Sequence, residues 1–421
     1  MYEQLKHGMK LQEVVIDIEK QIAQVFQDID HMIEKNQFKV LKSFQKHQVT
    51  DAHFHGTTGY GYDDFGRDTI EAIYADVFGA EAGLVRPQLI SGTHAITTAL
   101  FGVLRPGDEL IYITGKPYDT LEGVIGLNDS GNGSLKDFHI NTKIVPLKDN
   151  KIDIDSVGQA ISAKTKMIAI QRSCGYDKRP SFSINEIGQA IQQIKADFPN
   201  IIVFTDNCYG EFTEDREPTQ VGADLMAGSL IKNPGGGLVK SGGYIVGNQN
   251  LVDQCAERLT APSLGREVGP TAGHLSDMYQ GFFLAPHVTG QALKGAVFTA
   301  ALMERLGMKT TPSWHDKRTD LIQSVTFDDP ETMVLFCQEI QKASPINSHV
   351  KPYPSEMPGY DSKVIMAAGT FVQGASLELS ADGPIRPPFT AFVQGGLTFA
   401  HVKAAVLSAL DVLMDKNLIH V

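Results

Sequence analysis

Two charged residues follow apolar runs of the kind that form buried parallel strands. The run IIVFTD (residues 201–206) ends on Asp206, and ADLMAGSLIK (residues 223–232) ends on Lys232. Ligands in open α/β sheets bind at the carboxyl ends of the strands, so both side chains are candidates for a ligand site. A buried carboxylate needs a cationic partner, and a desolvated lysine can form a Schiff base. Taken singly, each also has a plain structural interpretation, a turn aspartate and a solvated loop lysine, and Lys240 is a rival to Lys232.

The sequence SGTHA (residues 91–95) joins an expected strand to an expected helix. Free backbone amides at a helix N-terminus suit a phosphate group, and here they begin at Gly92, with the Thr93 hydroxyl as a further donor. A simple glycine turn with a Ser or Thr cap is the alternative. Tyr118 follows the next expected strand, and its ring could stack on a planar cofactor or pack within the protein.

These four features have one economical explanation in their chain order. A phosphate site, an aromatic plate, an acid for a ring nitrogen and a lysine nucleophile are what pyridoxal 5′-phosphate (PLP) requires. The motifs are SGTHA, RPGDELIYITGKPY, DNCY and SLIK, the last running from Ser229 to Lys232. Over roughly residues 55–300 they resemble the fold-type-I PLP-dependent enzymes, most closely the Cys/Met-metabolism group with cystathionine lyases and methionine γ-lyase. TTGYGYDDFGRD and QGGLTF are similar to a divergent branch described as aluminium resistance proteins.

The resemblance implies a role for each matched residue. Lys232 would hold PLP and, once the substrate amine displaces it, would remove the Cα proton as a general base. Asp206 would keep the pyridine nitrogen protonated, while Tyr118 would stack on the ring and help to protonate a leaving thiolate. Three further residues of the motifs would contribute to cofactor binding: Gly92, Thr93 and Ser229.

The function implied is that of a PLP-dependent carbon–sulfur lyase acting on a small sulfur amino acid such as cystathionine, methionine or cysteine. Elimination would release a thiol, ammonia and a 2-oxo acid. An aminotransferase or aldolase on the same fold is an alternative, because a fold does not fix the reaction. A PLP-binding protein without efficient turnover, linked to metal-stress tolerance, is the alternative from a different class.

Candidate substrate residues come from two loops. GYGYDDFGR loosely matches the Tyr-x-Arg loop that relatives offer to the neighbouring subunit's phosphate, so Tyr60 or Tyr62 would be its tyrosine and Arg67 its arginine. Arg386 in ADGPIRPPF is the candidate for the substrate carboxylate, and an ion pair with Asp382 is its alternative. Since such relatives build each active site at a subunit interface, we expect a homodimer or homotetramer with shared active sites.

Alternation of strand and helix patterns predicts an α/β fold with a mainly parallel sheet. Further strands are expected in RPQLISG (86–92), ELIYIT (109–114), KTKMIAIQRS (164–173) and SGGYIVGN (241–248), and helices in 1–50, 93–104, 184–198, 290–306 and 401–415. The amphipathic N-terminal helix needs a partner surface, on its own chain or on another subunit. We predict an N-terminal helical arm (1–55), a PLP-binding large domain of the aspartate-aminotransferase-like class (56–295) and a smaller α+β C-terminal domain (296–421).

Composition excludes some classes of partner. The net charge of −12 argues against a nucleic-acid or anionic-membrane surface, and no apolar run approaches the length of a membrane span. The four cysteines form no CxxC pair and the N-terminus lacks a signal-peptide core, so we expect a cytoplasmic protein without a disulfide framework. His53 and His55 would share one side of a strand, but with no third ligand in view no metal site is predicted.

Overall fold

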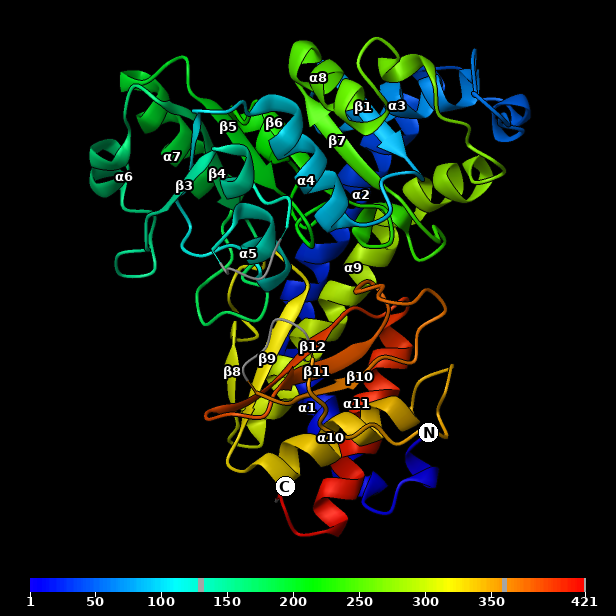
Figure 1. Cartoon of the computed structure of the whole chain (residues 1–421). Helices are drawn as coiled ribbons and strands as arrows, with labels where there is room; N and C mark the ends of the chain where they lie inside the picture. Colours follow the sequence, from blue (N-terminus) through cyan, green and yellow to red (C-terminus); the bar gives the residue numbers. More distant parts are fainter. Residues whose placement is uncertain (128–131, 358–361, 420–421) are drawn as a thin grey trace. The chain divides into compact units, whose positions relative to one another are not determined.

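The computed structural model describes residues 1–127, 132–357 and 362–419 (Figure 1). The chain divides into two compact units, one of residues 36–284 and one of residues 1–35 with 285–421. Compactness does not show which segments fold independently, so the three regions bounded at residues 55 and 295 stay a prediction. Within the part that the structure describes, no helix is both long enough and apolar enough to cross a membrane.

A seven-stranded sheet runs through the unit of residues 36–284. Its spatial order is β1 (Ala82–Arg86), β7 (Gly243–Gly247), β6 (Leu225–Ser229), β5 (Ile202–Asp206), β4 (Thr165–Gln171), β2 (Glu109–Tyr112) and β3 (Asn141–Ile144). The strands from β6 to β3 are parallel, whereas β7 is antiparallel to both β6 and β1. The prediction of a mainly parallel sheet is confirmed.

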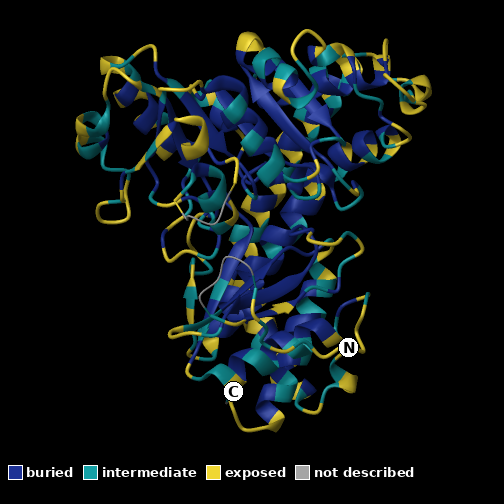
Figure 2. Cartoon of the chain, viewed as in Figure 1, coloured by how far each residue is buried: buried dark blue, intermediate teal, exposed yellow. Residues whose placement is uncertain are grey.

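Both faces of the sheet are buried at the central strands β4, β5 and β6, which explains their continuous apolar runs. Met167 and Ala169 of β4 join the core under α4 (Gly92–Val103) and α8 (Gln249–Leu259). Ile168 and Ile170 point to the opposite face, because side chains alternate along a strand, and join α6 (Ile154–Ala160) and α7 (Ile184–Asp197). Figure 2 shows the central strands as buried, whereas the edge strand β3 carries exposed and half-buried residues.

Local signals in the sequence account for several helix ends. Ser183 and Glu186 form a capping box that starts α7, and Ser91 caps α4 by accepting the N–H of His94. Asp64 caps α3 (Phe65–Phe78), which ends at Gly79 with a left-handed φ of 67° that glycine adopts without strain. The short helix α5 (Asp119–Ile125) follows Tyr118 directly.

Two predicted elements are misplaced, and one local prediction is wrong. The strand expected at 86–92 is β1, which ends at Arg86, because Pro87 has no N–H for a ladder hydrogen bond. The helix expected from residue 290 is α9 (Leu275–Arg305), which begins earlier and continues through Pro286. His53 lies in a 3-10 turn over 51–54 instead of a strand, since its ring accepts the N–H of Thr50 in a capping box, and His55 follows that turn.

The other unit contains a separate five-stranded antiparallel sheet, as an α+β region requires. Its order is β10 (Val364–Ala367), β11 (Ser380–Pro384), β12 (Phe389–Gln394), β9 (Ile322–Phe327) and β8 (Lys309–Thr311). Its helices are α1 (Gly8–Gln21), α10 (Pro330–Lys342) and α11 (Phe399–Asp415), with the first part of α2 (Ala23–Lys46) and the second part of α9.

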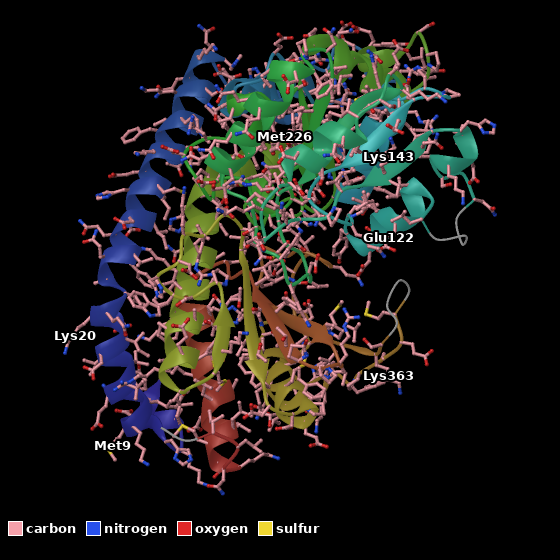
Figure 3. All side chains as sticks on the ribbon, turned by 90° about the vertical axis from the view of Figure 1, so that its left-hand side faces the viewer. Met9, Lys20, Glu122, Lys143, Met226 and Lys363 are labelled. Atoms are coloured by element: carbon pink, nitrogen blue, oxygen red, sulfur yellow. The ribbon has the colours of Figure 1, made fainter. Side chains whose placement is uncertain are left out.

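The N-terminal arm finds a partner surface within its own unit. Leu11, Val15 and Ile18 are buried on one face of α1, and the backbone N–H of Lys6 donates to Asp411 of α11 at 3.0 Å. Figure 3 shows Met9 pointing away from the ribbon of α1, and its side chain is exposed. The N-terminal helix therefore packs on its own chain, one of the two partner surfaces expected from the sequence.

Candidate active site

The carboxyl ends of three adjacent parallel strands meet at one edge of the seven-stranded sheet. Asp206, at the end of β5, lies opposite Gln171 of β4 and Ala227 of β6 in the strand register. The strand β6 ends two residues later at Ser229, and the chain then turns to Lys232. The structure thus brings together two charged residues that are 26 positions apart in sequence.

Asp206 is a buried carboxyl group with little compensation for its charge. Its Oδ1 accepts the backbone N–H of Cys208 at 3.1 Å, and no ion pair to it occurs among the residues that the structure describes. Burial raises the pKa of Asp206 because it disfavours the charged form, and the nearby Lys232 and the Cys208 N–H offset this only in part. A cationic N–H from a ligand would complete the site.

The Lys232 side chain is half-buried and lies over an aromatic ring. Its Nζ is 3.8 Å from the centroid of the Tyr209 ring. Burial lowers the pKa of Lys232, but the interactions with Cys208, Tyr209, Asp206 and Tyr118 outweigh it and raise the pKa above its ordinary value. The free lysine is therefore an ammonium group at neutral pH.

The rival lysine lies elsewhere. Lys240 is exposed and forms an ion pair with Asp277 in which the nitrogen–oxygen distance is 2.9 Å. That contact favours the interpretation of Lys240 as a surface residue and of Lys232 as the lysine of the site.

The N-terminus of α4 lies against the ends of β5 and β6. A Cβ atom added at Gly92 would be 3.0 Å from the Cys208 sulfur and 3.2 Å from the Ser229 Cβ, which is tighter than most Cβ contacts, so glycine suits this close approach. The first amides of a helix have no partner within the helix, and they carry the positive end of its dipole. The Thr93 hydroxyl lies 3.0 Å from that of Thr120. These are the groups that the sequence predicts to bind the cofactor phosphate.

Tyr118 is held at the same edge by a residue that the motifs did not indicate. Its backbone N–H donates to Oε1 of Gln171 at 2.6 Å, and Gln171 is the last residue of β4. A Cβ at Gly175 would lie 3.3 Å from the Tyr118 ring, so a glycine there leaves room for the ring. Tyr118 itself is half-buried, as a residue at the mouth of a site would be.

The donor set at this edge fits PLP. The amides and hydroxyl at the start of α4 could bind its phosphate, Asp206 could pair with its ring nitrogen, and Lys232 could bond its aldehyde carbon. The fit rests on two features of the chain itself: a buried acid without a bonded cation, and a helix start kept open by Gly92.

Besides Gln171, sequence reasoning missed three residues near this site. Tyr209 lies under Lys232, and its place in DNCY was the available signal. Arg179 is buried and its guanidinium donates to the carbonyls of Gln171 and Ser173, close enough to lower the pKa of Asp206. Glu211 is completely buried and bonds Tyr244 from a distant strand, for which the sequence gives no signal.

Arg172 belongs to a buried network instead of the ligand edge. Its guanidinium donates to Glu214 at 2.9 Å, to Asn207 at 2.9 Å and to the carbonyl of Gly210 at 2.8 Å, and it is 3.4 Å from Glu217. These contacts hold the loop that follows Asp206. They engage the Arg172 guanidinium in ion pairs and hydrogen bonds within the protein, instead of with a cofactor or substrate.

The substrate candidates come from two other loops of the chain. Tyr60 and Tyr62 are exposed and stack on each other with ring centroids 5.6 Å apart. Arg67 is buried, and its Nη1 donates to the carbonyl of Gly61 at 2.6 Å, which occupies it in shaping the loop. Arg386 is exposed in the turn between β11 and β12, while Asp382 is buried in β11. The roles of Tyr60, Tyr62 and Arg386 stay predictions.

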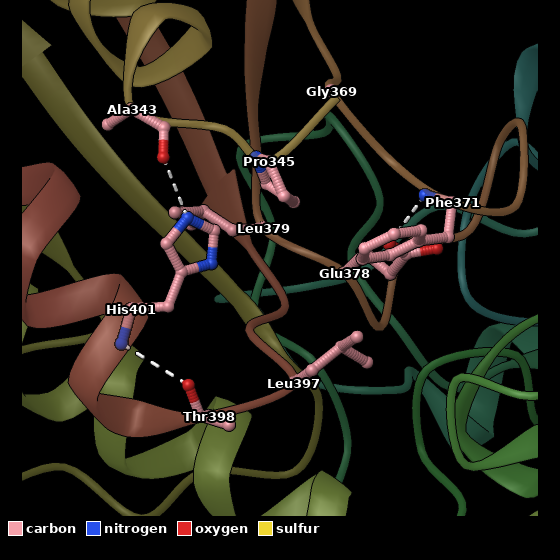
Figure 4. Close-up of a pocket in the computed structure, with 9 residues that line it drawn as sticks. All are labelled: Ala343, Pro345, Gly369, Phe371, Glu378, Leu379, Leu397, Thr398 and His401. Carbon is pink, nitrogen blue, oxygen red and sulfur yellow. Dashed lines mark hydrogen bonds between the residues drawn. The ribbon is translucent and has the colours of Figure 1, made fainter. Parts of the chain in front are cut away.

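A cavity in the unit of residues 1–35 and 285–421 contains none of the candidate residues (Figure 4). It encloses about 300 Å³ between the ends of α10 and α11. The Glu378 carboxylate accepts the N–H groups of Phe371 and Val372, and His401 Nε2 lies 2.9 Å from the carbonyl of Ala343, so these polar groups brace the walls. Across the described ranges, no group of three His, Cys, Asp or Glu residues is placed to hold a metal ion.

Comparison with known proteins gives a consistent match over the whole chain. The methionine gamma-lyase family model matches residues 11–414. An uncharacterised protein of Bacillus subtilis is 62% identical over 421 residues, covering 100% of both chains. A solved structure of a candidate cystathionine beta-lyase involved in aluminum resistance, from Listeria monocytogenes, is 59% identical with a TM-score of 0.94, covering 95% of this chain and 99% of that one.

More distant structures share the architecture. A PLP-dependent protein of Escherichia coli aligns over 91% of this chain and 97% of its own with a TM-score of 0.62, at 17% identity. At that identity the likeness shows the fold alone. The two-sheet architecture is that of fold-type-I PLP-dependent enzymes, as predicted.

Proposed function

This chain belongs to the methionine gamma-lyase family, and we propose that it is a PLP-dependent carbon–sulfur lyase acting on a small sulfur-containing amino acid. The observation that carries the proposal is the convergence of Lys232, Asp206 and the start of α4 on one sheet edge. These groups come from three separate segments of the chain, and together they match the charge pattern of PLP. The full-length family match supports the choice of a lyase over other reactions of this fold.

When bound, PLP supplies an electron-accepting ring that stabilises a carbanion at the substrate Cα. The side chains provide the proton movements. The Nζ of Lys232 would bond the cofactor and, once the substrate amine replaces it, would take the proton from Cα as a free amine. Its position over Tyr209 keeps the nitrogen near Asp206 while it is not covalently engaged.

The residues around Lys232 would bind the charged groups of the cofactor and protonate the leaving group. Asp206, buried and without an ion pair among the described residues, would keep a proton on the ring nitrogen. The N-terminus of α4 would bind the phosphate through its amides, with Thr93 and Ser229 beside it. Tyr118, anchored through Gln171, would stack on the ring and donate a proton to the leaving thiolate. The products would be a thiol, ammonia and a 2-oxo acid.

Completion of the site would depend on a second copy of the chain. Tyr60 and Tyr62 are exposed large aromatic residues, whose apolar surface is typical of an interface. We propose that they reach the phosphate and substrate of a neighbouring subunit in a homodimer or homotetramer. Arg386, exposed on its hairpin turn, is the proposed partner of the substrate carboxylate.

The test is release of 2-oxo acid and ammonia by the PLP-loaded protein with cystathionine, cysteine, methionine and homocysteine. Lys232→Ala removes the proposed nucleophile and base, and Lys240→Ala is the matched control because Lys240 is an exposed lysine paired with Asp277. Release that persists in Lys240→Ala and vanishes in Lys232→Ala supports the lyase. The identity of the oxo acid separates β from γ elimination.

Other outcomes favour the alternatives. Amino-acid formation only when a 2-oxo acid is added would indicate an aminotransferase, and aldehyde release from a β-hydroxy amino acid would indicate an aldolase. A protein that retains PLP but converts none of these substrates would be a binding protein, which would return attention to metal-stress tolerance. Equal activity in Lys232→Ala and the wild type would contradict the assignment of the lysine.

A further inference from the structure

Glu211 is a completely buried acid that the proposed chemistry does not use. It follows Asp206 by five residues. Its Oε1 accepts the hydroxyl of Tyr244 at 2.7 Å, whereas its Oε2 is buried without a hydrogen-bond partner in the described chain. A buried carboxylate oxygen with no partner is costly, so the arrangement favours a carboxyl group that retains its proton.

The strand that leads to Lys232 is shaped around this acid. Gly228 of β6 lies opposite Tyr244 of β7 in the antiparallel register. A Cβ added at Gly228 would be 2.5 Å from Glu211 Oε1 and 2.7 Å from the Tyr244 hydroxyl. The glycine therefore lets the Glu211–Tyr244 pair pack directly against the backbone of β6, whose last residue is Ser229.

A second link joins Glu211 to the lysine segment through the main chain. The side-chain amide of Asn233, the residue after Lys232, donates to the carbonyl of Glu211 at 2.9 Å and to that of Tyr209 at 3.1 Å. The segment carrying Lys232 and the segment carrying Glu211 are thus fixed to each other. Glu211 contacts the β6 strand on one side of Lys232 and Asn233 on the other.

The groups electrostatically coupled to Glu211 come from several elements. They are Tyr74 of α3, Tyr244 of β7, Cys208 and Glu217 of the loops around it, and Lys232. The pKa of Glu211 is raised to about 8, chiefly by burial and also by Glu217, although the Tyr244 hydrogen bond and Lys232 oppose the rise. Lys232 is the cation of this set, so Glu211 and Lys232 each favour the charged form of the other.

We propose that Glu211 is a positioning residue for Lys232: a buried acid, clamped by Tyr244 against β6, whose protonation state sets the charge around the lysine nitrogen. The inference rests on the proposed function in taking Lys232 as the cofactor lysine. Below its pKa the acid would be uncharged and would add nothing to the stability of a protonated lysine nitrogen. In alkaline solution the carboxylate would form and favour a protonated lysine nitrogen.

The experiment is a pH titration of visible absorbance, because the colour of PLP held by a lysine reports protonation of the lysine nitrogen. The PLP-loaded wild type is compared with Glu211→Gln, Tyr244→Phe and the control Glu13→Gln, which removes an exposed carboxylate of α1. The midpoint should fall by about half a pH unit or more in Glu211→Gln, since the carboxylate that favours the protonated nitrogen is gone. Tyr244→Phe should shift it the same way, and Glu13→Gln should not.

An unchanged midpoint in Glu211→Gln overturns the proposal. If the PLP-loaded protein shows the visible absorbance but converts no substrate, the lyase assignment fails. The pH midpoints of the variants and the wild type can still be compared. If no chromophore forms, urea unfolding of the cofactor-free chain at about pH 9, above the folded pKa of Glu211, tests the same coupling through Glu211→Gln, Lys232→Ala and the double variant. A non-additive effect supports the proposal, and additive effects overturn it.

Discussion

The ammonium nitrogen of Lys232 lies 3.8 Å from the centroid of the Tyr209 ring. Tyr209 reaches this place with a left-handed backbone, at a φ of 72°, which side chains other than glycine adopt at a cost of about 1 kcal/mol or more. Asn233 holds the carbonyl of the same residue at 3.1 Å. The ring is therefore fixed beneath the lysine, and a cation over an aromatic face is attracted to it.

Replacing Tyr209 by leucine should impair Lys232 without unfolding the chain. Leucine has the same backbone strain at a positive φ but lacks an aromatic face. The substitution therefore removes the cation–π attraction to Lys232, which is worth about 0.5–2 kcal/mol. We expect kcat to fall roughly 2- to 30-fold. Tyr209→Phe keeps the face and is the control. Steady-state kinetics and circular dichroism check this. A Tyr209→Phe variant as impaired as Tyr209→Leu would show that the hydroxyl, not the ring face, matters.

Gly92→Ala should weaken binding of the cofactor phosphate specifically. The added methyl group would meet the Cys208 sulfur at 3.0 Å and the Ser229 Cβ at 3.2 Å, so these neighbours or the start of α4 must give by a few tenths of an ångström where the phosphate is expected. We expect the affinity for PLP to fall about tenfold or more, since a displaced set of amides loses charge-assisted hydrogen bonds worth about 1.5–3 kcal/mol. Affinity for pyridoxal, which lacks the phosphate, should change little. Equal losses for both ligands would assign Gly92 to packing alone.

Asp206→Asn should stabilise the cofactor-free chain while it disables the enzyme. Burial raises the pKa of Asp206 in the folded chain above its value in the unfolded chain. As the pH rises, this carboxyl therefore loses its proton first in the unfolded state. The free energy of unfolding falls over the pH range between the two pKa values. The variant removes this loss, so its advantage in thermal unfolding should be small in acid and grow toward neutral pH. The gain is limited to about 1.4 kcal/mol per unit of pKa shift. A variant less stable than the wild type at neutral pH would contradict this account.

Asp206→Asn should also slow proton removal from the substrate Cα. Asparagine has no charge to keep a proton on the ring nitrogen, so exchange of the substrate Cα proton in deuterated water should slow by about 100-fold, as for loss of a buried charged partner. Exchange at the wild-type rate would mean that another residue serves the ring nitrogen.

The candidate site residues that lie at strand ends could be predicted from the sequence, because their signals lie in neighbouring residues. Asp206 and Lys232 each follow an apolar run, and the alternation of buried residues in β4 and β5 makes such runs readable as strands. The cradle at Gly92 was predictable because a Ser-capped helix start follows a turn. The helix ends and the parallel sheet were predictable for the same reason: their signals lie within a few neighbouring residues.

Long-range partners could not be predicted in this way. Glu211 follows β5 and bonds Tyr244 of β7, which is 33 residues away, and the two meet because β6 pairs with both strands. The ion pairs of Arg172 with Glu214 and Glu217 are equally unreadable from the sequence, because an arginine at a strand end has the same local sequence whether it binds a ligand or a buried acid. The early end of β1 was in principle readable from Pro87, but the apolar residues beyond it obscured the boundary.

Shared active sites predict that two inactive variants restore activity to each other. Lys232→Ala lacks the proposed nucleophile, and a double change of Tyr60 and Tyr62 to alanine lacks the exposed aromatic pair proposed to reach the neighbouring subunit. In a mixed dimer, one site combines an intact Lys232 from one copy with intact tyrosines from the other. After unfolding and refolding together, activity should reach about one quarter of wild type, the share of intact sites that random pairing gives in a twofold dimer. Refolding each variant alone is the control, and light scattering establishes the oligomeric state. A mixture no more active than its components would mean that Tyr60 and Tyr62 serve the site of their own chain or none.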